Sequence, residues 1–430
     1  RVVPFKGSVS LLPSMRPVPN KTEPAELVTK MLRNELSDLE IRTMLPEVFS
    51  ELHPETGIYV QMKAEDEQKR SVSALSCIHM MLTDRYDAFV QKQPEQERMS
   101  REVWANLQQT VRWANMDEYM VHAMFVFLAI RGCGKVKALT RGLPREIRAS
   151  PETSVLHLLE TVPEISSSYE RLSSDMQMLV QKALITHSHF NLAQLLQAEN
   201  NPSQIEVLQS YVHREGETLL KFYIINLMAI MCALRGTETL HGSLFMNNSN
   251  GKTVLAGVQC LQHLATAKPQ AIYWTFVRKR AHQLGLLCNS LQELVLARLA
   301  CLNRATPGDV PMLQEAWSKL TEAECTILTE HFLSDGIQEQ CILFSFLPLF
   351  FQNARGNKAV GLHRALLVLI DILELLVEDG RMEENKDMNI TVDLSDVAYY
   401  AREVKSSQMF EATPLFCKVT YTATHVQVAI

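Results

Sequence analysis

Apolar residues recur at helical spacing along most of the chain between residues 101 and 380. The 3.6-residue period repeats from segment to segment, and the short joints contain Gly, Pro, Asn or Ser. Residues 120–130 are apolar except for His122, and residues 215–234 are apolar nearly all round, so both segments are predicted to be buried core helices. The pattern predicts an all-α fold of stacked helical hairpins, either a HEAT-like superhelix or a compact orthogonal helical domain.

Capping residues mark where several helices begin and end. Ser100, Asp117 and the pair Ser150-Pro151 each precede an apolar-periodic segment, and Thr321 with Glu324 forms a capping box. The glycines of the segment 131–134 (RGCG) are predicted to end the helix before them by adopting positive φ.

The C-terminal pattern differs from the rest. Residues 418–430 alternate with β periodicity and are rich in Val and Thr, which predicts a short strand. A strand needs a partner for its backbone, and the candidates are residues 57–62, residues 388–394, the N-terminal arm or another chain. Residues 341–351 are predicted to be a core helix kinked at Pro348.

Composition shifts divide the chain into five parts. The first holds five prolines, which predicts an extended arm, and the third is strongly basic. The predicted parts are a Pro-rich arm (1–24), an N-terminal helical region (25–134), a basic linker (135–150), a central helical core (151–380) and a C-terminal segment with a short helix and a terminal strand (381–430).

Bulk composition narrows the function classes. A formal charge of −6 argues against a general nucleic-acid binder, and the basic segment 135–148 has no aromatic residue to stack on a base. No apolar run reaches the roughly 20 residues that span a bilayer. Nine cysteines without a CxxC pair indicate reduced thiols and a cytoplasmic location. Because the chain begins at Arg1 without Met, we expect an excerpt or a processed product.

Familiar catalytic motifs are missing from the sequence. Residues 250–253 (NGKT) resemble the end of a P-loop, but Met246 stands where the motif requires Gly, so a helix cap at 248–250 is the favoured interpretation. There is no GxSxG and no HExxH. Cys133 lies between two glycines near Lys135, and a reactive thiol there is the alternative to a simple helix end.

Two polar clusters remain as candidate sites. The segment 187–217 carries the residues of a possible metal site, with ligands His189, Glu199, His213 and Glu217. The aromatic segment 344–351 is either core, or the wall of an apolar ligand pocket or a groove for a partner helix; His331, Asp335 and Asn353 would supply polar groups to such a pocket.

The sequence therefore predicts a non-enzymatic α-helical interaction module, a scaffold or adaptor that binds one or more protein partners and needs no cofactor. An all-α enzyme, or a protein binding a small molecule or metal in a pocket among the central helices, is the alternative. A third possibility is membrane insertion through the apolar segments 222–234 or 366–376.

Overall fold

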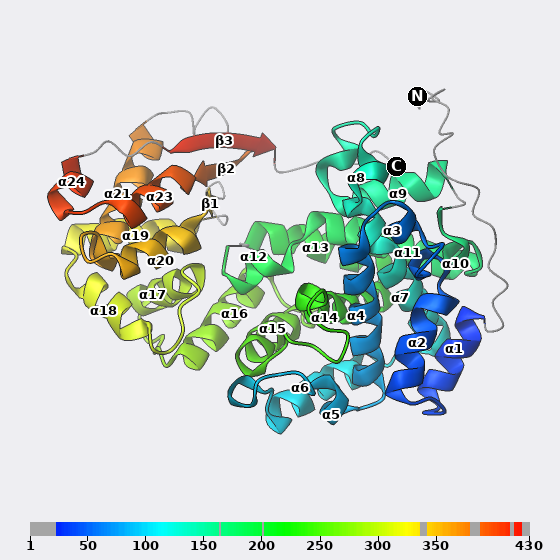
Figure 1. Cartoon of the computed structure of the whole chain (residues 1–430). Helices are drawn as coiled ribbons and strands as arrows, with labels where there is room; N and C mark the ends of the chain where they lie inside the picture. Colours follow the sequence, from blue (N-terminus) through cyan, green and yellow to red (C-terminus); the bar gives the residue numbers. More distant parts are fainter. Residues whose placement is uncertain are drawn as a thin grey trace. The chain divides into compact units, whose positions relative to one another are not determined.

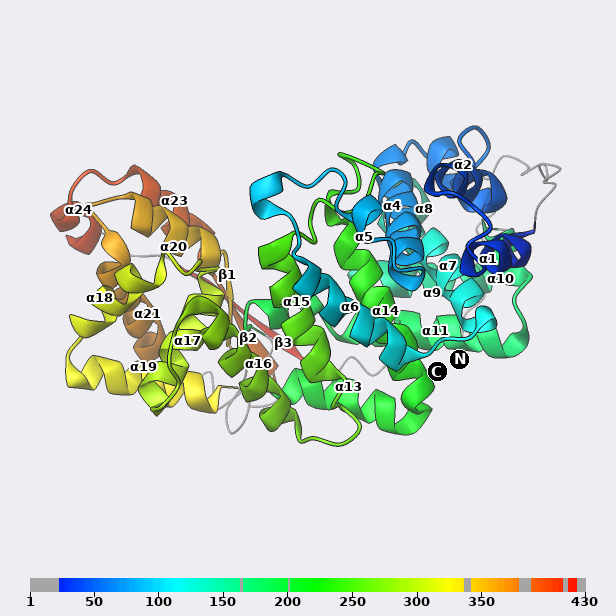
Figure 2. The same ribbon diagram turned by 90° about the horizontal axis from the view of Figure 1, so that it is seen from below.

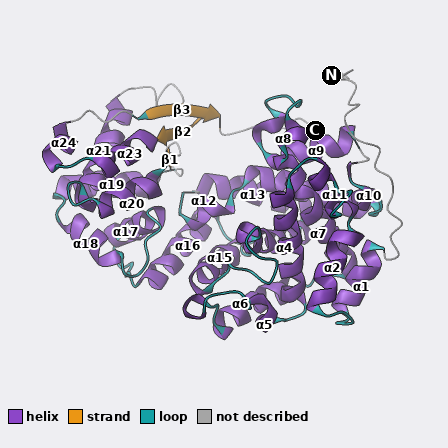
Figure 3. Ribbon diagram, in the orientation of Figure 1, coloured by secondary structure: helices purple, strands orange, loops and turns teal. Residues whose placement is uncertain are grey.

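The structure is a computed structural model that describes residues 23–162, 165–199, 202–335, 342–378, 388–412 and 417–423. Helices dominate these residues, and a small three-stranded sheet forms from segments in the last quarter of the chain (Figures 1 and 3). The prediction of an all-α fold with a short C-terminal β element is confirmed. The predicted Pro-rich arm lies outside the described residues except for Glu23 and Pro24.

The chain forms two compact units. Unit 1 contains residues 1–188 and 217–252, and unit 2 contains residues 189–216 and 253–430. The chain passes from one unit to the other at three places. Two of these boundaries fall within helices, at the end of α11 (Ser174–His189) and inside α15 (Asn248–Leu261). The basic segment 135–150 lies inside unit 1. A short helix lies at each end of this segment, and helix α9 packs on both of these short helices.

Three helices form the centre of unit 1. Helices α4 (Glu65–Leu82), α7 (Glu118–Arg131) and α14 (Glu217–Cys232) pack on one another although α14 is far from α4 in sequence (Figures 1 and 2). Every α7 residue from 120 to 130 is buried except His122. Because α4 contacts helices distant in the chain, unit 1 matches the compact arrangement and not a sequential superhelix.

The other helices of unit 1 surround this centre. The caps predicted at Ser100, Asp117 and Ser150 are present, each accepting a hydrogen bond from a backbone N–H in the first turn. The surrounding elements are α1 (Pro24–Leu32), α2 (Asp38–Val48), η1 (Ser50–Leu52), α3 (Ile58–Gln61), α5 (Tyr86–Phe89), η2 (Glu95–Glu97), α6 (Arg101–Ala114), η3 (Gly132–Lys135), α8 (Lys137–Thr140), η4 (Ile147–Ala149), α9 (Pro151–Thr161), α10 (Ser167–Glu170) and η6 (Ala233–Arg235).

Unit 2 combines helices with the sheet. The capping box of Thr321 and Glu324 is confirmed, and α17 packs on both α16 and α19 while α20 packs on α21 and α23. Its helices are α12 (Leu192–Leu196), α13 (Pro202–Glu215), α16 (Pro269–Leu284), α17 (Leu291–Leu302), α18 (Val310–Ser318), α19 (Glu322–Ser334), α20 (Leu347–Gly356), α21 (Gly361–Glu378), α23 (Ser395–Glu403) and α24 (Ser407–Ala412).

The sheet has the order β1–β2–β3. Strand β2 (Met388–Asp393) pairs in parallel with β1 (Ile342–Ser345) and antiparallel with β3 (Lys418–Ala423). Of the predicted partners for the C-terminal strand, residues 388–394 are thus the correct one, whereas residues 57–62 contain helix α3. The predicted continuation at 424–430 lies outside the described residues.

The predicted kinked helix at 341–351 is wrong. Its first half is strand β1, Phe346 adopts φ +64°, and α20 begins at Leu347 with Pro348 in its first turn. Proline lacks an N–H, and a first-turn N–H has no partner within the helix, so Pro348 starts α20 without bending it. The apolar character of β1 reflects burial of Ile342 and Phe344.

Two predicted helix ends also need correction. Gly132 has φ −62°, so the turn after α7 uses no left-handed glycine there. Gly134 is required for close packing instead, because a Cβ atom would overlap the carbonyl of Pro151. The cap of α15 is Asn247, whose Oδ1 accepts from the N–H of Asn250 at 3.0 Å, and not a residue at 248–250.

Candidate cationic site on unit 1

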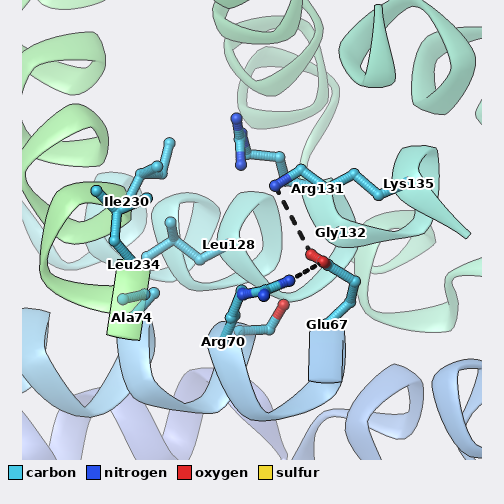
Figure 4. Close-up of a pocket in the computed structure, with 11 residues that line it drawn as sticks. Glu67, Arg70, Ala74, Leu128, Arg131, Gly132, Lys135, Ile230 and Leu234 are labelled. Atoms are coloured by element: carbon cyan, nitrogen blue, oxygen red, sulfur yellow. Dashed lines mark hydrogen bonds and ion pairs between the residues drawn. The ribbon is translucent and has the colours of Figure 1, made fainter. Parts of the chain in front are cut away.

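A pocket opens on unit 1 where α4, the end of α7, η3 and the α14–η6 junction meet (Figure 4). It is a shallow hollow, half open to solvent, with a cavity volume of about 50 Å³. One side is apolar and the other carries four charged side chains. The apolar side consists of Ala74, Leu128, Ile230, Ala233 and Leu234, and the charged side consists of Glu67, Arg70, Arg131 and Lys135.

Glu67 lies between two cations. Its carboxylate contacts the Arg70 guanidinium one turn later on α4 and lies 3.7 Å from Lys135 Nζ (Figure 4). The Glu67 side chain is 17% exposed, and the two cations are 37% and 38% exposed. Burial lowers the pKa of Lys135, and the nearby Arg131 charge adds to this effect.

Arg131 makes a different ion pair. Its guanidinium points away from Glu67 (Figure 4) and binds the carboxylate of Glu152, in the first turn of α9, at 2.7 Å. The Glu152 side chain is buried and paired with Arg131. The Nε atom of Arg131 is also buried, but it has no hydrogen-bond partner. A buried donor that lacks a partner has lost its hydration without gaining a hydrogen bond, which costs free energy.

Two aromatic polar residues lie in the core within electrostatic range of Arg131. The rings of His187 and Tyr223 are 4.5 Å apart, and neither His187 Nε2 nor the Tyr223 hydroxyl has a hydrogen-bond partner. Burial and the Arg131 charge lower the pKa of His187 well below its usual value. Burial and the Glu152 charge raise the pKa of Tyr223. Both groups are therefore neutral at pH 7.

A basic surface segment directly follows Lys135. Lys137, Arg141, Arg145 and Arg148 are exposed, and Glu146 is the one acid among them. None of these four cations forms an ion pair with any residue that the structure describes. Val136 between η3 and α8 is buried, so the start of this segment is fixed to unit 1.

The predicted metal ligands are not gathered into a site. His189 packs on Tyr211, with the two rings 5.0 Å apart, while burial raises the pKa of Glu199. His213 is exposed, and Glu217 pairs with Lys221 at 3.1 Å. Within the described ranges, no three His, Cys, Asp or Glu residues are placed to hold a metal ion.

The second predicted cluster has structural roles. Asp335 forms a buried ion pair with Arg298 and accepts from the N–H of Ile342 at 2.9 Å. Asn353 donates from Nδ2 to the carbonyl of Ala398 at 2.8 Å and ties α20 to α23. Burial lowers the pKa of His331 to about 4. These contacts stabilise unit 2.

The remaining candidate chemistry is not supported. Cys133 is 3% exposed, and burial raises the pKa of its thiol to about 12, which does not favour an activated thiolate. Residues 250–253 lie inside α15, where the Asn250 side chain donates to the carbonyl of Phe245 at 2.9 Å. The segment therefore has the conformation of a helix and not of a phosphate-binding loop.

The sequence did not predict that the charged pocket residues meet, although Lys135 was named as part of the basic segment. In the sequence, Arg131 is the last residue of an apolar helical segment, and Glu67 and Arg70 are two charged residues of the helix α4. Their convergence depends on packing among α4, α7 and α14, for which a single sequence carries no signal. The sequence shows one feature of this cluster in advance: Glu67 and Arg70 are three residues apart, a spacing that allows an ion pair on one helix face.

One helix among the described residues is long and apolar enough to cross a membrane by length and composition. It covers Glu217–Arg235, and 72% of its most apolar stretch is buried inside the structure. A core helix of a soluble protein meets the same test.

Fold and site together define an α-helical protein of two units with a cationic pocket on the first. Residues 30–416 match a family of unknown function, DUF6829, and the chain belongs to that family. No curated protein matches the chain. No solved structure matches it either.

Proposed function

We propose that the protein is a non-enzymatic α-helical interaction module, a scaffold or adaptor, and that unit 1 binds an acidic segment of a protein partner. The observation that carries the proposal is the exposed cluster of Lys137, Arg141, Arg145 and Arg148, which has no acidic partner among the described residues. Four like charges held near one another repel, and an acidic partner would relieve that repulsion.

A polypeptide partner fits this surface better than a nucleic acid. Residues 137–148 contain no aromatic side chain for base stacking, and the chain as a whole is acidic. Carboxylates of an extended acidic segment match the guanidinium groups in geometry and charge. The mostly buried, unpaired cysteines support a reducing compartment, so we place the module in the cytoplasm.

The test compares two charge-reversed triple variants of the full chain. Arg141→Glu, Arg145→Glu and Arg148→Glu together are expected to weaken binding of a short peptide of alternating Glu and Ala by about tenfold or more. The matched control reverses three exposed lysines of unit 2, Lys268, Lys358 and Lys405, and is expected to leave the affinity unchanged.

Fluorescence anisotropy with labelled peptide measures both affinities, and raising the salt concentration should weaken binding by the wild-type chain. Equal losses in the two variants would contradict the proposal. So would tighter binding of a single-stranded RNA of the same length, because the surface would then be a nucleic-acid site.

A further inference from the structure

The pocket beside the basic segment joins two kinds of surface. Its charged side holds Glu67 between Arg70 and Lys135, and its apolar side presents Ala74, Leu128, Ile230, Ala233 and Leu234. Figure 4 shows Ile230 and Leu234 on the side of the pocket away from Glu67. A ligand that contacts both sides of this half-open hollow must therefore be polar at one end and apolar at the other.

The charges favour a single negative charge on the ligand. Arg70, Arg131 and Lys135 face only two acids, Glu67 and Glu152, so the site keeps one positive charge in excess. Arg131 is already bound to Glu152, which leaves Arg70 and Lys135 as the cations that a ligand can reach. Both are about one-third exposed.

Glu67 occupies the position that an incoming anion would take. It belongs to the first turn of α4, and a side-chain rotation can move its carboxylate toward solvent without moving the helix. The ion pairs of Glu67 are partly exposed, so breaking them costs little. Glu67 thus competes with a ligand for the same two cations.

We propose that this pocket binds a carboxylate attached to a short branched apolar group, and that Glu67 takes the ligand's place in the unliganded protein. Arg70 and Lys135 hold the carboxylate, and the apolar side holds the branched group. The proposal does not depend on the basic segment 137–148. The carboxylate has two sources, a free branched-chain acid or a polypeptide end with a C-terminal leucine.

Titration calorimetry of the full chain tests the proposal with two probes, 4-methylpentanoate and acetyl-Ala-Ala-Leu with a free carboxylate. Binding by either probe is expected, and the tighter one identifies the source. Lys135→Gln should weaken binding about tenfold, because a charge-assisted hydrogen bond is lost. Glu67→Gln should strengthen it several-fold, since the internal competitor loses its charge.

Lys92→Gln serves as the matched control, because Lys92 is an exposed cation of unit 1 that lies outside the pocket and outside the basic segment. Its affinity should equal that of the wild type, and thermal unfolding checks that all three variants remain folded. The proposal is overturned if neither probe binds, if 4-methylpentanamide binds as tightly as the acid, or if Glu67→Gln leaves the affinity unchanged. Tighter binding of inorganic phosphate would also overturn it.

Discussion

Arg298 and Arg131 show how neighbouring groups decide the role of a charged residue. Arg298 is 2% exposed, pairs with Asp335, and donates from Nη1 to the carbonyl of Phe332 at 2.7 Å. Arg131 has one acidic partner and an Nε atom without any. Arg298 therefore stabilises unit 2, whereas the hydrogen bonds of Arg131 are only partly satisfied.

His79 makes stability depend on pH. It is 1% exposed, and burial together with the Arg85 charge lowers its pKa to about 4, against the opposing effect of Asp38. Between pH 6.5 and 4 the unfolded chain binds more protons at this residue than the folded chain does. The stabilisation is complete above pH 6.5 and is lost as the pH falls toward 4.

We expect His79 to account for roughly 2 kcal/mol of lost stability between pH 7 and pH 5. His79→Leu should remove that part of the loss, measured by urea-dependent hydrogen exchange of peptides from α4. His213→Leu, at an exposed position, should retain the wild-type dependence. The prediction is contradicted if His79→Leu loses as much stability between pH 7 and pH 5 as the wild type does, because the loss would then not come from protonation of His79.

At the scale of elements, the sequence predicted what local chemistry controls. The capping residues Ser100, Asp117 and Thr321 begin helices where the sequence predicted them. Caps and apolar faces depend on residues within one or two turns, so one sequence is enough to find them.

Elements that depend on distant segments could not be found in this way. Strand β1 has four residues, and its partner β2 begins more than forty residues later. A run this short does not distinguish a strand from a buried helix. The pocket poses the same problem at larger scale, because its lining comes from α4, α7, η3, α14 and η6.

The contact between η3 and α9 depends on a glycine. A Cβ atom at Gly134 would overlap the backbone carbonyl of Pro151, while one at Gly142 would meet nothing within 4 Å. Gly134→Ala should therefore destabilise unit 1 by about 3 kcal/mol, because backbone must shift to admit the methyl group. Gly142→Ala should be neutral or slightly stabilising.

Chemical unfolding of the two alanine variants measures this difference in free energy. Equal stabilities would mean that η3 and α9 do not pack as closely as the structure has them.

At the scale of the whole molecule, the chain passes between its two units three times. The segment 189–216 belongs to unit 2, where the carbonyl of Ala198 accepts from the Tyr273 hydroxyl at 2.8 Å and from Arg298 Nε at 3.3 Å. A single cut of the chain cannot separate the units, because residues 253–430 alone would lack these contacts. We therefore design every binding experiment on the full chain.

The interaction surface itself is tested most directly by hydrogen-exchange footprinting of the full chain with and without the Glu-Ala peptide. Peptides that cover residues 137–148 should exchange more slowly when the acidic peptide is bound, and those from α18 should be unchanged. Protection confined to unit 2, or none at saturating peptide, would contradict the account.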